Sequence, residues 1–150
     1  MTDYDLRLLA EWPCASEYPV LPIGLYRQGR VAADSTHALL EFFKVINVFS
    51  NTGAAQRAWI ARQLPALGTR RRWTEANDRI QHLGMSVADA AAYLFESGRC
   101  AVAHSYSDPV VDPDDARDLF RLARDLPVMQ ALAEHALVAH FAVPEPDWLV

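Results

Sequence analysis

Arg99, His104 and Tyr106 lie within one short segment, and their side chains are suited to chemistry on a phosphodiester. A guanidinium binds phosphate through two parallel hydrogen bonds and offsets charge in the transition state. An imidazole can move a proton near neutral pH. Arg99 follows Phe95 by four residues and precedes Val102 by three, so it lies on the apolar face of a predicted helix. A charge there requires a partner, and the structural alternative is a core arginine paired with an acidic side chain, beside a histidine at the helix end.

The spacing of Arg99 and His104 limits how a single helix could use them. On an ideal α-helix, two residues with this separation are about 140° apart around the axis and about 7.5 Å apart along it. Both side chains therefore cannot grip one phosphate unless the helix ends or deforms near His104. The alternative is that two chains bring two copies of the motif together.

Arg70, Arg71 and Arg72 form a cluster of basic residues, and Arg79 follows nearby. If their helix flanks the cleft that holds Arg99, these side chains could follow the backbone of an RNA strand. The alternative is an ordinary solvated helix face. The RNA-binding residues predicted from the sequence are therefore Arg70, Arg71, Arg72 and Arg79.

No metal or cofactor site is predicted. The sequence lacks a Gly-rich phosphate-binding loop, an H-E-x-x-H zinc motif and a G-x-S-x-G nucleophile motif. His135 and His140 lie on different faces of one predicted helix, so they cannot share a metal ion there. The acidic run from Asp108 to Asp118 lacks the central glycine and the distal glutamate of a calcium loop, so helix capping and solvation explain it better.

The chain has 150 residues, a formal net charge of −5 and 51% hydrophobic residues, which is typical of one folded domain. Its acidity argues against strong non-specific binding to duplex DNA. No stretch approaches the roughly 18 uninterrupted apolar residues of a membrane span, and the N-terminus lacks the basic start of a signal peptide. Cys14 and Cys100 are far apart and are expected to be free thiols. We therefore expect a cytoplasmic protein with no membrane partner.

Helical periodicity dominates the chain after residue 34, and we predict an all-α bundle of about five helices. Prolines and glycines interrupt any period before that point, so residues 1–34 are expected to form an irregular arm packed on the helical body. Residues 35–142 would form the domain and residues 143–150 a tail. The first expected helix follows a cap at Asp34 or Ser35 and runs to Ser50, and the second runs from about Ala54 to Leu64, where Pro65 and Gly68 end it. The third runs from roughly Arg70 to His82 and is stopped by Gly84. The fourth runs from Ser86 to about His104, and the last from a cap at Asp112 to Phe141 with a kink or break at Pro127.

The segment at residues 37–50 is apolar over most of its circumference, with Glu41, Lys44 and Asn47 as a narrow polar stripe. A helix with this pattern lies at the centre of a bundle or across a subunit interface.

The pair Arg99-x4-His104, at the end of a long predicted helix in an all-α domain of this size, resembles the HEPN superfamily (higher eukaryotes and prokaryotes nucleotide-binding), whose signature is R-x4–6-H. Tyr106 matches the R-x4-H-x-Y form of HEPN toxins from toxin–antitoxin pairs. The order of an apolar helix, a helix with Trp59, the motif helix and a final helix with an acidic start is also similar to HEPN proteins related to methylamine-utilisation accessory proteins. The resemblance covers roughly residues 35–142.

The resemblance implies a homodimer in which two copies of the motif face each other, formed through the motif helix and the apolar helix at residues 37–50. Many HEPN proteins are metal-independent endoribonucleases in which the RNA 2′-OH attacks the adjacent phosphate. On this interpretation Arg99 would hold and neutralise the phosphate, and His104 would act as general acid or base. Tyr106 would support them or accept a nucleotide from a partner nucleotidyltransferase-type antitoxin.

Cys100 departs from the HEPN pattern, in which the residue after the arginine is often Asn, Asp or His. A thiol is a weak hydrogen-bonding group, so a second interpretation stays open, namely a non-catalytic HEPN-type scaffold or nucleotide-binding accessory protein. The position of Arg99 and the presence of Tyr106 favour the first interpretation, an endoribonuclease or RNA-binding protein in a toxin–antitoxin, defence or stress setting. No cofactor is expected for either function.

Overall fold

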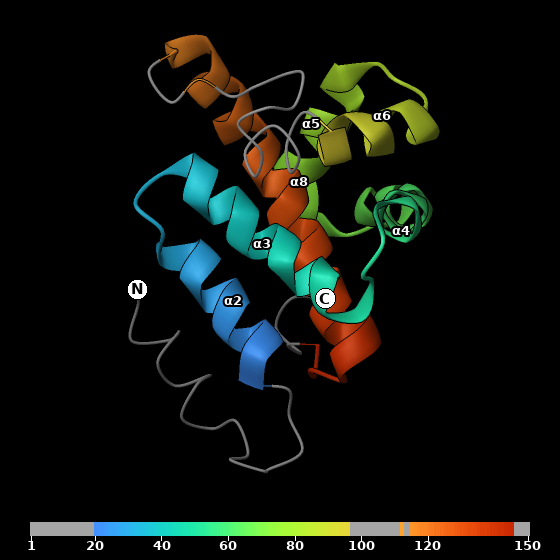
Figure 1. Ribbon diagram of the computed structural model, residues 1–150. Helices are drawn as coiled ribbons and strands as arrows, with labels where there is room; N and C mark the ends of the chain where they lie inside the picture. Colours follow the sequence, from blue (N-terminus) through green and yellow to red (C-terminus); the bar gives the residue numbers. More distant parts are fainter. Residues whose placement is uncertain (1–19, 97–111, 113–114, 146–150) are drawn as a thin grey trace.

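The computed structural model describes residues 20–96, 112 and 115–145, and this part of the chain folds into six α-helices and one short 3₁₀-helix, with no strand (Figure 1). The all-α helical bundle predicted from the sequence is confirmed. The elements are α2 (Val20–Val31), α3 (Ser35–Phe49), α4 (Gly53–Leu67), the 3₁₀-helix η1 (Arg71–Trp73), α5 (Thr74–Leu83), α6 (Val87–Tyr93) and α8 (Ala116–Phe141).

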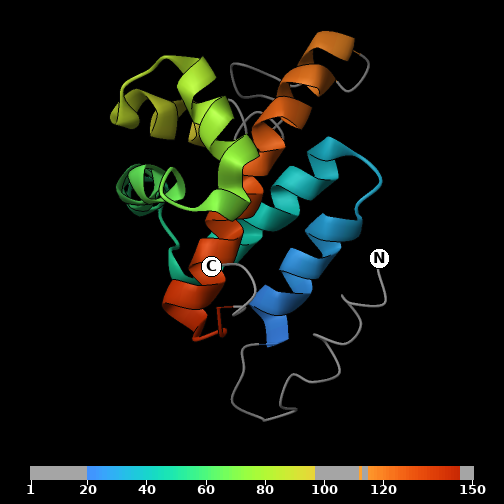
Figure 2. The same cartoon turned by 180° about the vertical axis from the view of Figure 1, so that it is seen from behind.

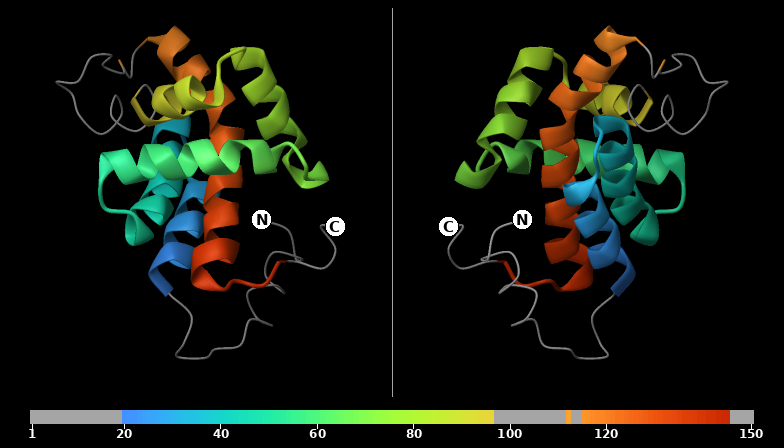
Figure 3. Two further views of the ribbon diagram at one scale, coloured as in Figure 1. Left: turned by 90° about the vertical axis from the view of Figure 1, so that its right-hand side faces the viewer. Right: turned by 90° about the vertical axis from the view of Figure 1, so that its left-hand side faces the viewer.

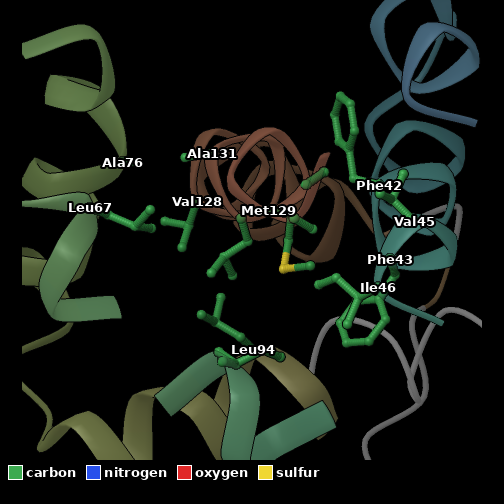
Figure 4. Packing of buried hydrophobic residues seen from close by; sticks show 14 of the residues in the cluster. Phe42, Phe43, Val45, Ile46, Leu67, Ala76, Leu94, Val128, Met129 and Ala131 are labelled. Carbon is green, nitrogen blue, oxygen red and sulfur yellow. The ribbon is translucent and has the colours of Figure 1, made fainter. Parts of the chain in front are cut away.

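Helix α8 is the axis of the bundle, about 39 Å long at 1.5 Å per residue. Helices α2 and α3 run along one side of α8, and α5 runs along the other (Figures 1 and 2). Helix α4 crosses α8 steeply (Figure 3). In the core Val128 of α8 points toward Leu67 of α4, whereas Met129 points toward the α3 side chains (Figure 4).

Helix α3 begins as predicted, since Asp34 Oδ1 accepts a hydrogen bond of 2.8 Å from the backbone N–H of His37. Five of its large apolar side chains are covered by α2, α8 and their neighbours within one chain, and each of the five is at most 1% exposed. The helix is therefore central, and these side chains are already buried before any dimer forms. They are Leu39, Phe42, Phe43, Val45 and Ile46.

The polar stripe expected on α3 is only partly in contact with solvent. Lys44 is exposed and Asn47 is half-buried, but Glu41 is 3% exposed. Lys44 pairs with Glu41 Oε1, while Glu41 Oε2 has no hydrogen-bond partner. The expectation of a solvated Glu41 is wrong because the packing of α3 against its neighbours covers this position.

The irregular arm expected at residues 1–34 is wrong for residues 20–31, which form α2. Pro22 lies in the first turn of α2, where a backbone N–H has no partner within the helix, so a proline is tolerated there. Gly29 faces Phe42 of α3, and a Cβ atom at Gly29 would lie 2.7 Å from that ring. Packing of α2 on α3 therefore uses the missing side chain of Gly29. Residues 1–19 lie outside the described part of the chain.

Two prolines expected to end or break helices lie inside them. Helix α4 continues past the predicted end at Leu64 to Leu67 with Pro65 in its last turn, and α8 continues through Pro127 as one helix. Each proline removes a single backbone donor, and packing against the neighbouring helices outweighs that loss. The cap of α8 is Asp115, which accepts a bond of 2.8 Å from the N–H of Arg117, and not Asp112 as expected.

The helix predicted from Ser86 begins where expected, because Ser86 Oγ accepts a hydrogen bond from the N–H of Asp89. It is α-helical to Tyr93 and continues as a π-helical turn over residues 94–96. The remainder of the predicted helix, and residues 146–150 of the predicted tail, lie outside the described residues. Over the described residues, no helix combines the length and the apolarity needed to cross a membrane.

Candidate functional site

Arg99, His104 and Tyr106 lie outside the described residues, so their predicted roles stay predictions. The described chain ends at Glu96, three residues before Arg99. The turn at residues 94–96 is π-helical, a geometry that is rare and occurs frequently at functional sites. The helix thus departs from ideal α geometry before the motif begins.

The segment that leads into the motif is fixed by contacts from α3 and α4. Phe95 is 7% exposed and packs edge-on against Phe43, with ring centres 5.9 Å apart. A Cβ atom at Gly53 would lie 2.8 Å from the Phe95 ring, so α4 approaches this ring as closely as a glycine allows. Arg57 lies over the same ring at 5.3 Å and forms a 3.0 Å ion pair with Glu96.

A buried carboxylate joins helices α5, α6 and α8. Asp125 of α8 is 1% exposed and accepts hydrogen bonds of 2.7 Å from Arg79 Nε of α5 and from the hydroxyl of Tyr93 of α6. Arg121 approaches the same carboxylate at 4.0 Å. Burial, and then the hydrogen bond to Asp125, raises the pKa of Tyr93. Arg79, predicted to bind RNA, is therefore engaged with Asp125 and has a side chain only 13% exposed.

The arginine cluster predicted to bind RNA lies at η1, and two of its members are paired with Glu145 at the end of the described chain. Arg70 Nη1 and Arg72 Nη2 both contact Glu145 Oε1, the latter at 3.0 Å. Arg71 is exposed. The structure thus brings Arg70 and Arg72 together, and it places Arg79 in the separate network of Asp125.

A second buried network surrounds Glu134 of α8. Tyr26 of α2 and Gln130 donate hydrogen bonds to Glu134 Oε1, and Trp73 Nε1 donates to Oε2 at 2.8 Å. Burial, and then the charge of Glu134, raises the pKa of Tyr26. A cavity of about 290 Å³ opens beside this network between the start of α5 and α8, with Arg72 in its wall.

His135 and His140 are held by aromatic rings. Trp59 Nε1 donates a 2.9 Å hydrogen bond to His140 Nε2, and the His140 ring stacks on Phe49 with centres 3.9 Å apart. His135 lies against the rings of Trp59 and Trp73. Desolvation lowers the pKa of both histidines, aided by Arg70 near His135 and by Arg62 near His140. Within the described part of the chain no three His, Cys, Asp or Glu residues are grouped as a metal site.

Asp125, Glu134, Glu145 and Tyr26 were not singled out from the sequence. A signal existed for Asp125, because it follows Leu122 and precedes Val128 by three residues each and so shares their buried face. Glu145 offered no such signal, because its partners lie more than seventy positions earlier in the chain.

A comparison with known protein families gives a match that spans most of the helices described above. A family profile described as methylamine utilization protein MauJ matches residues 22–138. The chain belongs to the MauJ family. No curated protein and no solved structure matches the chain.

MauJ is a HEPN-like family, and this agrees with the general resemblance to HEPN proteins seen in the sequence. The match begins inside α2 and ends three residues before the end of α8. It therefore includes most of α2, a segment for which the sequence predicts an irregular arm. It also spans the positions of Arg99, His104 and Tyr106, although a match over a range does not test the role of individual residues.

Proposed function

We propose that this MauJ-family chain is a metal-independent endoribonuclease that carries its chemistry on Arg99 and His104. The observation that carries the proposal is the spacing Arg99-x4-His104-x-Tyr106 within the matched range of a HEPN-like family.

In the proposed reaction the RNA itself supplies the nucleophile. The 2′-oxygen bonds to the adjacent phosphorus while the bond from phosphorus to the 5′-oxygen breaks, leaving a 2′,3′-cyclic phosphate and a 5′-hydroxyl. His104 would take the proton from the 2′-OH or return a proton to the leaving oxygen. Arg99 would hold the phosphate and offset its charge in the transition state. Tyr106 would support Arg99 and His104 or serve as the acceptor of a nucleotide.

A homodimer is part of this proposal, because two motifs that face each other would supply Arg99 and His104 to one phosphate. The interface would lie on the motif segments. The buried side chains of α3 cannot contribute without unfolding the bundle, so α3 would contribute only its exposed positions, among them Val48 at 40% exposure.

The test is cleavage of single-stranded RNA by the purified chain in excess EDTA. We expect products with 2′,3′-cyclic phosphate ends, and we expect DNA of the same sequence to stay intact because it lacks the 2′-OH. Arg99→Ala and His104→Ala should each lower the rate by about 10²–10⁴-fold. Arg117→Ala and His82→Ala are matched controls at exposed positions and should cut at the wild-type rate. Cutting that survives Arg99→Ala unchanged would contradict the proposal.

A toxin–antitoxin setting with a nucleotidyltransferase-type partner gives Tyr106 a distinct role. Incubation with such a partner and a nucleoside triphosphate should add the mass of a nucleotide to the wild-type chain and not to Tyr106→Phe. A modification that persists in Tyr106→Phe would contradict this role.

A second candidate function is a non-catalytic scaffold or nucleotide-binding accessory protein. It is favoured by the pairing of Arg70, Arg72 and Arg79 with carboxylates, which leaves less positive charge for an RNA backbone. The same assay separates the two functions. Absence of cleavage over several RNAs, together with retained nucleotide binding, would favour the accessory function.

A further inference from the structure

We propose that Arg70, Arg72 and Trp73 form a phosphate-binding site, and that the carboxylate of Glu145 occupies this site until an RNA phosphate displaces it. The RNA part of this inference rests on the proposed function, whereas the phosphate site itself does not. We call the four residues the η1 anion site, after the 3₁₀-helix at its base.

The two guanidinium groups of the η1 anion site converge on one acceptor. Arg72 Nη2 and Arg70 Nη1 both contact Oε1 of Glu145. The same two groups lie over the ring of Trp73, at 4.4 Å for Arg72 and 5.3 Å for Arg70. Stacking on an aromatic face holds a guanidinium in place and leaves its edge for an anion. Two arginines fixed in this way form a receptor for an oxyanion, and Glu145 provides one.

Glu145 does not satisfy this receptor completely. The Arg72 side chain is only 8% exposed, yet its Nε has no hydrogen-bond partner. Glu134 Oε2 lies 3.9 Å from this Nε, beyond hydrogen-bond distance, and already accepts from Trp73 Nε1. Desolvation lowers the pKa of Arg72, the effect expected for a buried cation with incomplete compensation. A phosphate group carries more acceptor oxygens than a carboxylate and could serve Nε as well.

Glu134 and Glu145 differ in how firmly the chain holds them. Glu134 is in the middle of α8 and is fixed by three donors. Glu145 lies beyond the end of α8, two residues after Val143, whose side chain is buried in the core. The Glu145 side chain is 36% exposed, and ion pairs at such positions are weak and easily exchanged. Glu145 is therefore the partner that an incoming anion can replace.

Space for a ligand larger than a single anion adjoins the site. The cavity of about 290 Å³ has Arg72 and Trp73 on one wall and Gln130 and Glu134 on the other. This volume is near the lower end of ligand pockets. An RNA phosphate bound by Arg72 would place the adjoining part of its nucleotide next to the Trp73 ring and the amide of Gln130.

Glu145→Gln tests the site, because it removes the competing charge with little change of shape. The probe is a short, fluorescently labelled 2′-O-methyl RNA strand, which cannot be cut by 2′-OH attack, followed by anisotropy over a range of salt concentrations. Freeing two guanidinium groups should tighten binding and make the slope of log affinity against log salt steeper by up to about 1.4. Glu96→Gln is the matched control, since it removes the same charge from the ion pair with Arg57.

Equal gains for Glu145→Gln and Glu96→Gln would overturn the site, because they would reflect net charge alone. Adding Arg70→Gln to Glu145→Gln should cut the gain in slope to at most about 0.7, because only Arg72 is then left free to bind a phosphate. Arg70 is the better second change because its side chain is 37% exposed and less needed for folding than that of Arg72.

A second arm uses inorganic phosphate and follows the indole N–H signal of Trp73 by NMR. Phosphate should shift this signal at lower concentration in Glu145→Gln than in the wild type, and no difference would overturn the site. If phosphate binds but RNA is neither bound nor cut, the site stands and the proposed function fails. If RNA is cut while Glu145→Gln binds like the wild type, the function stands and this inference fails.

Discussion

His135 and His140 show how single residues of this chain respond to their surroundings. Their rings are packed among Phe49, Trp59 and Trp73, and arginines lie close to both. Burial and nearby positive charge both disfavour the imidazolium form, so the pKa of each histidine is lowered below its ordinary value of 6.5. These histidines therefore behave as aromatic packing groups near neutral pH.

We expect this shift to make the folded state less stable in acid. Below pH 6.5 the unfolded chain binds more protons at these two positions than the folded chain, so the free energy of unfolding should fall as the pH falls. The slope should stay below about 1.4 kcal/mol per pH unit for each histidine, because both rings partly contact solvent. Urea unfolding at several pH values between 7 and 5 measures this slope of the free energy of unfolding.

Two single variants can show which arginine lowers the pKa of each histidine. Arg70→Gln should raise the pKa of His135 and leave His140 nearly unchanged, whereas Arg62→Gln should do the reverse. NMR titration of the imidazole protons measures the pKa values of both histidines. A His135 that titrates above 6.5 in the wild type would contradict the packing described above.

At the scale of elements, α2 depends on a close approach to α3. Gly29 and Gly24 are both inside α2, but they face different surroundings. A Cβ atom at Gly29 would lie 2.7 Å from a ring carbon of Phe42, whereas one at Gly24 would meet nothing within 4 Å. Glycine lowers helix stability at both positions, but only at Gly29 does packing require it.

We expect Gly29→Ala and Gly24→Ala to change stability in opposite directions. Gly29→Ala should lower the free energy of unfolding by about 1–3 kcal/mol, because the added methyl group forces the Phe42 ring or α2 to shift. Gly24→Ala should raise it by about 0.5–1 kcal/mol by favouring the helix. Urea denaturation of the two variants and the wild type measures both effects, and a stabilising Gly29→Ala would show that α2 does not pack on α3 as described.

At the scale of the whole molecule, one long helix organises the bundle, and among the described residues eight large apolar side chains stay exposed, including Phe120 of that helix at 67%. Helix α8 contacts α2, α3, α4, α5 and η1. Most of the apolar side chains of α3 are buried by these contacts, with exposed Val48 as an exception, although the sequence alone allowed them to form a dimer interface. A dimer must therefore use other surfaces of the chain.

We expect light scattering at micromolar concentration to give a mass of twice 16.8 kDa. The dimer should persist when exposed Val48 of α3 is changed to Ser, because the motif segments would supply most of the interface. A strict monomer would contradict the composite site proposed for Arg99 and His104, and would leave the η1 anion site unaffected, since that site lies within one chain.

The sequence by itself determined the helical class and several helix ends. The structure reproduces the predicted helix starts at Asp34 and Ser86. It also reproduces the helix end at Gly84, whose φ is 60°. These signals are reliable because each depends on hydrogen bonds or backbone preferences within a few residues of the position concerned.

Only the tertiary structure decided where prolines are tolerated and which charges are paired. Pro65 and Pro127 remain inside helices because the packing of many side chains outweighs the loss of one backbone hydrogen bond. The sequence predicts a basic surface that includes Arg70, Arg72 and Arg79. In the structure these arginines are paired with Glu145 and Asp125, which lie far away in the sequence. Such pairs form only when helices distant along the chain are brought together, so a local pattern could indicate that Asp125 is buried but not which arginine pairs with it.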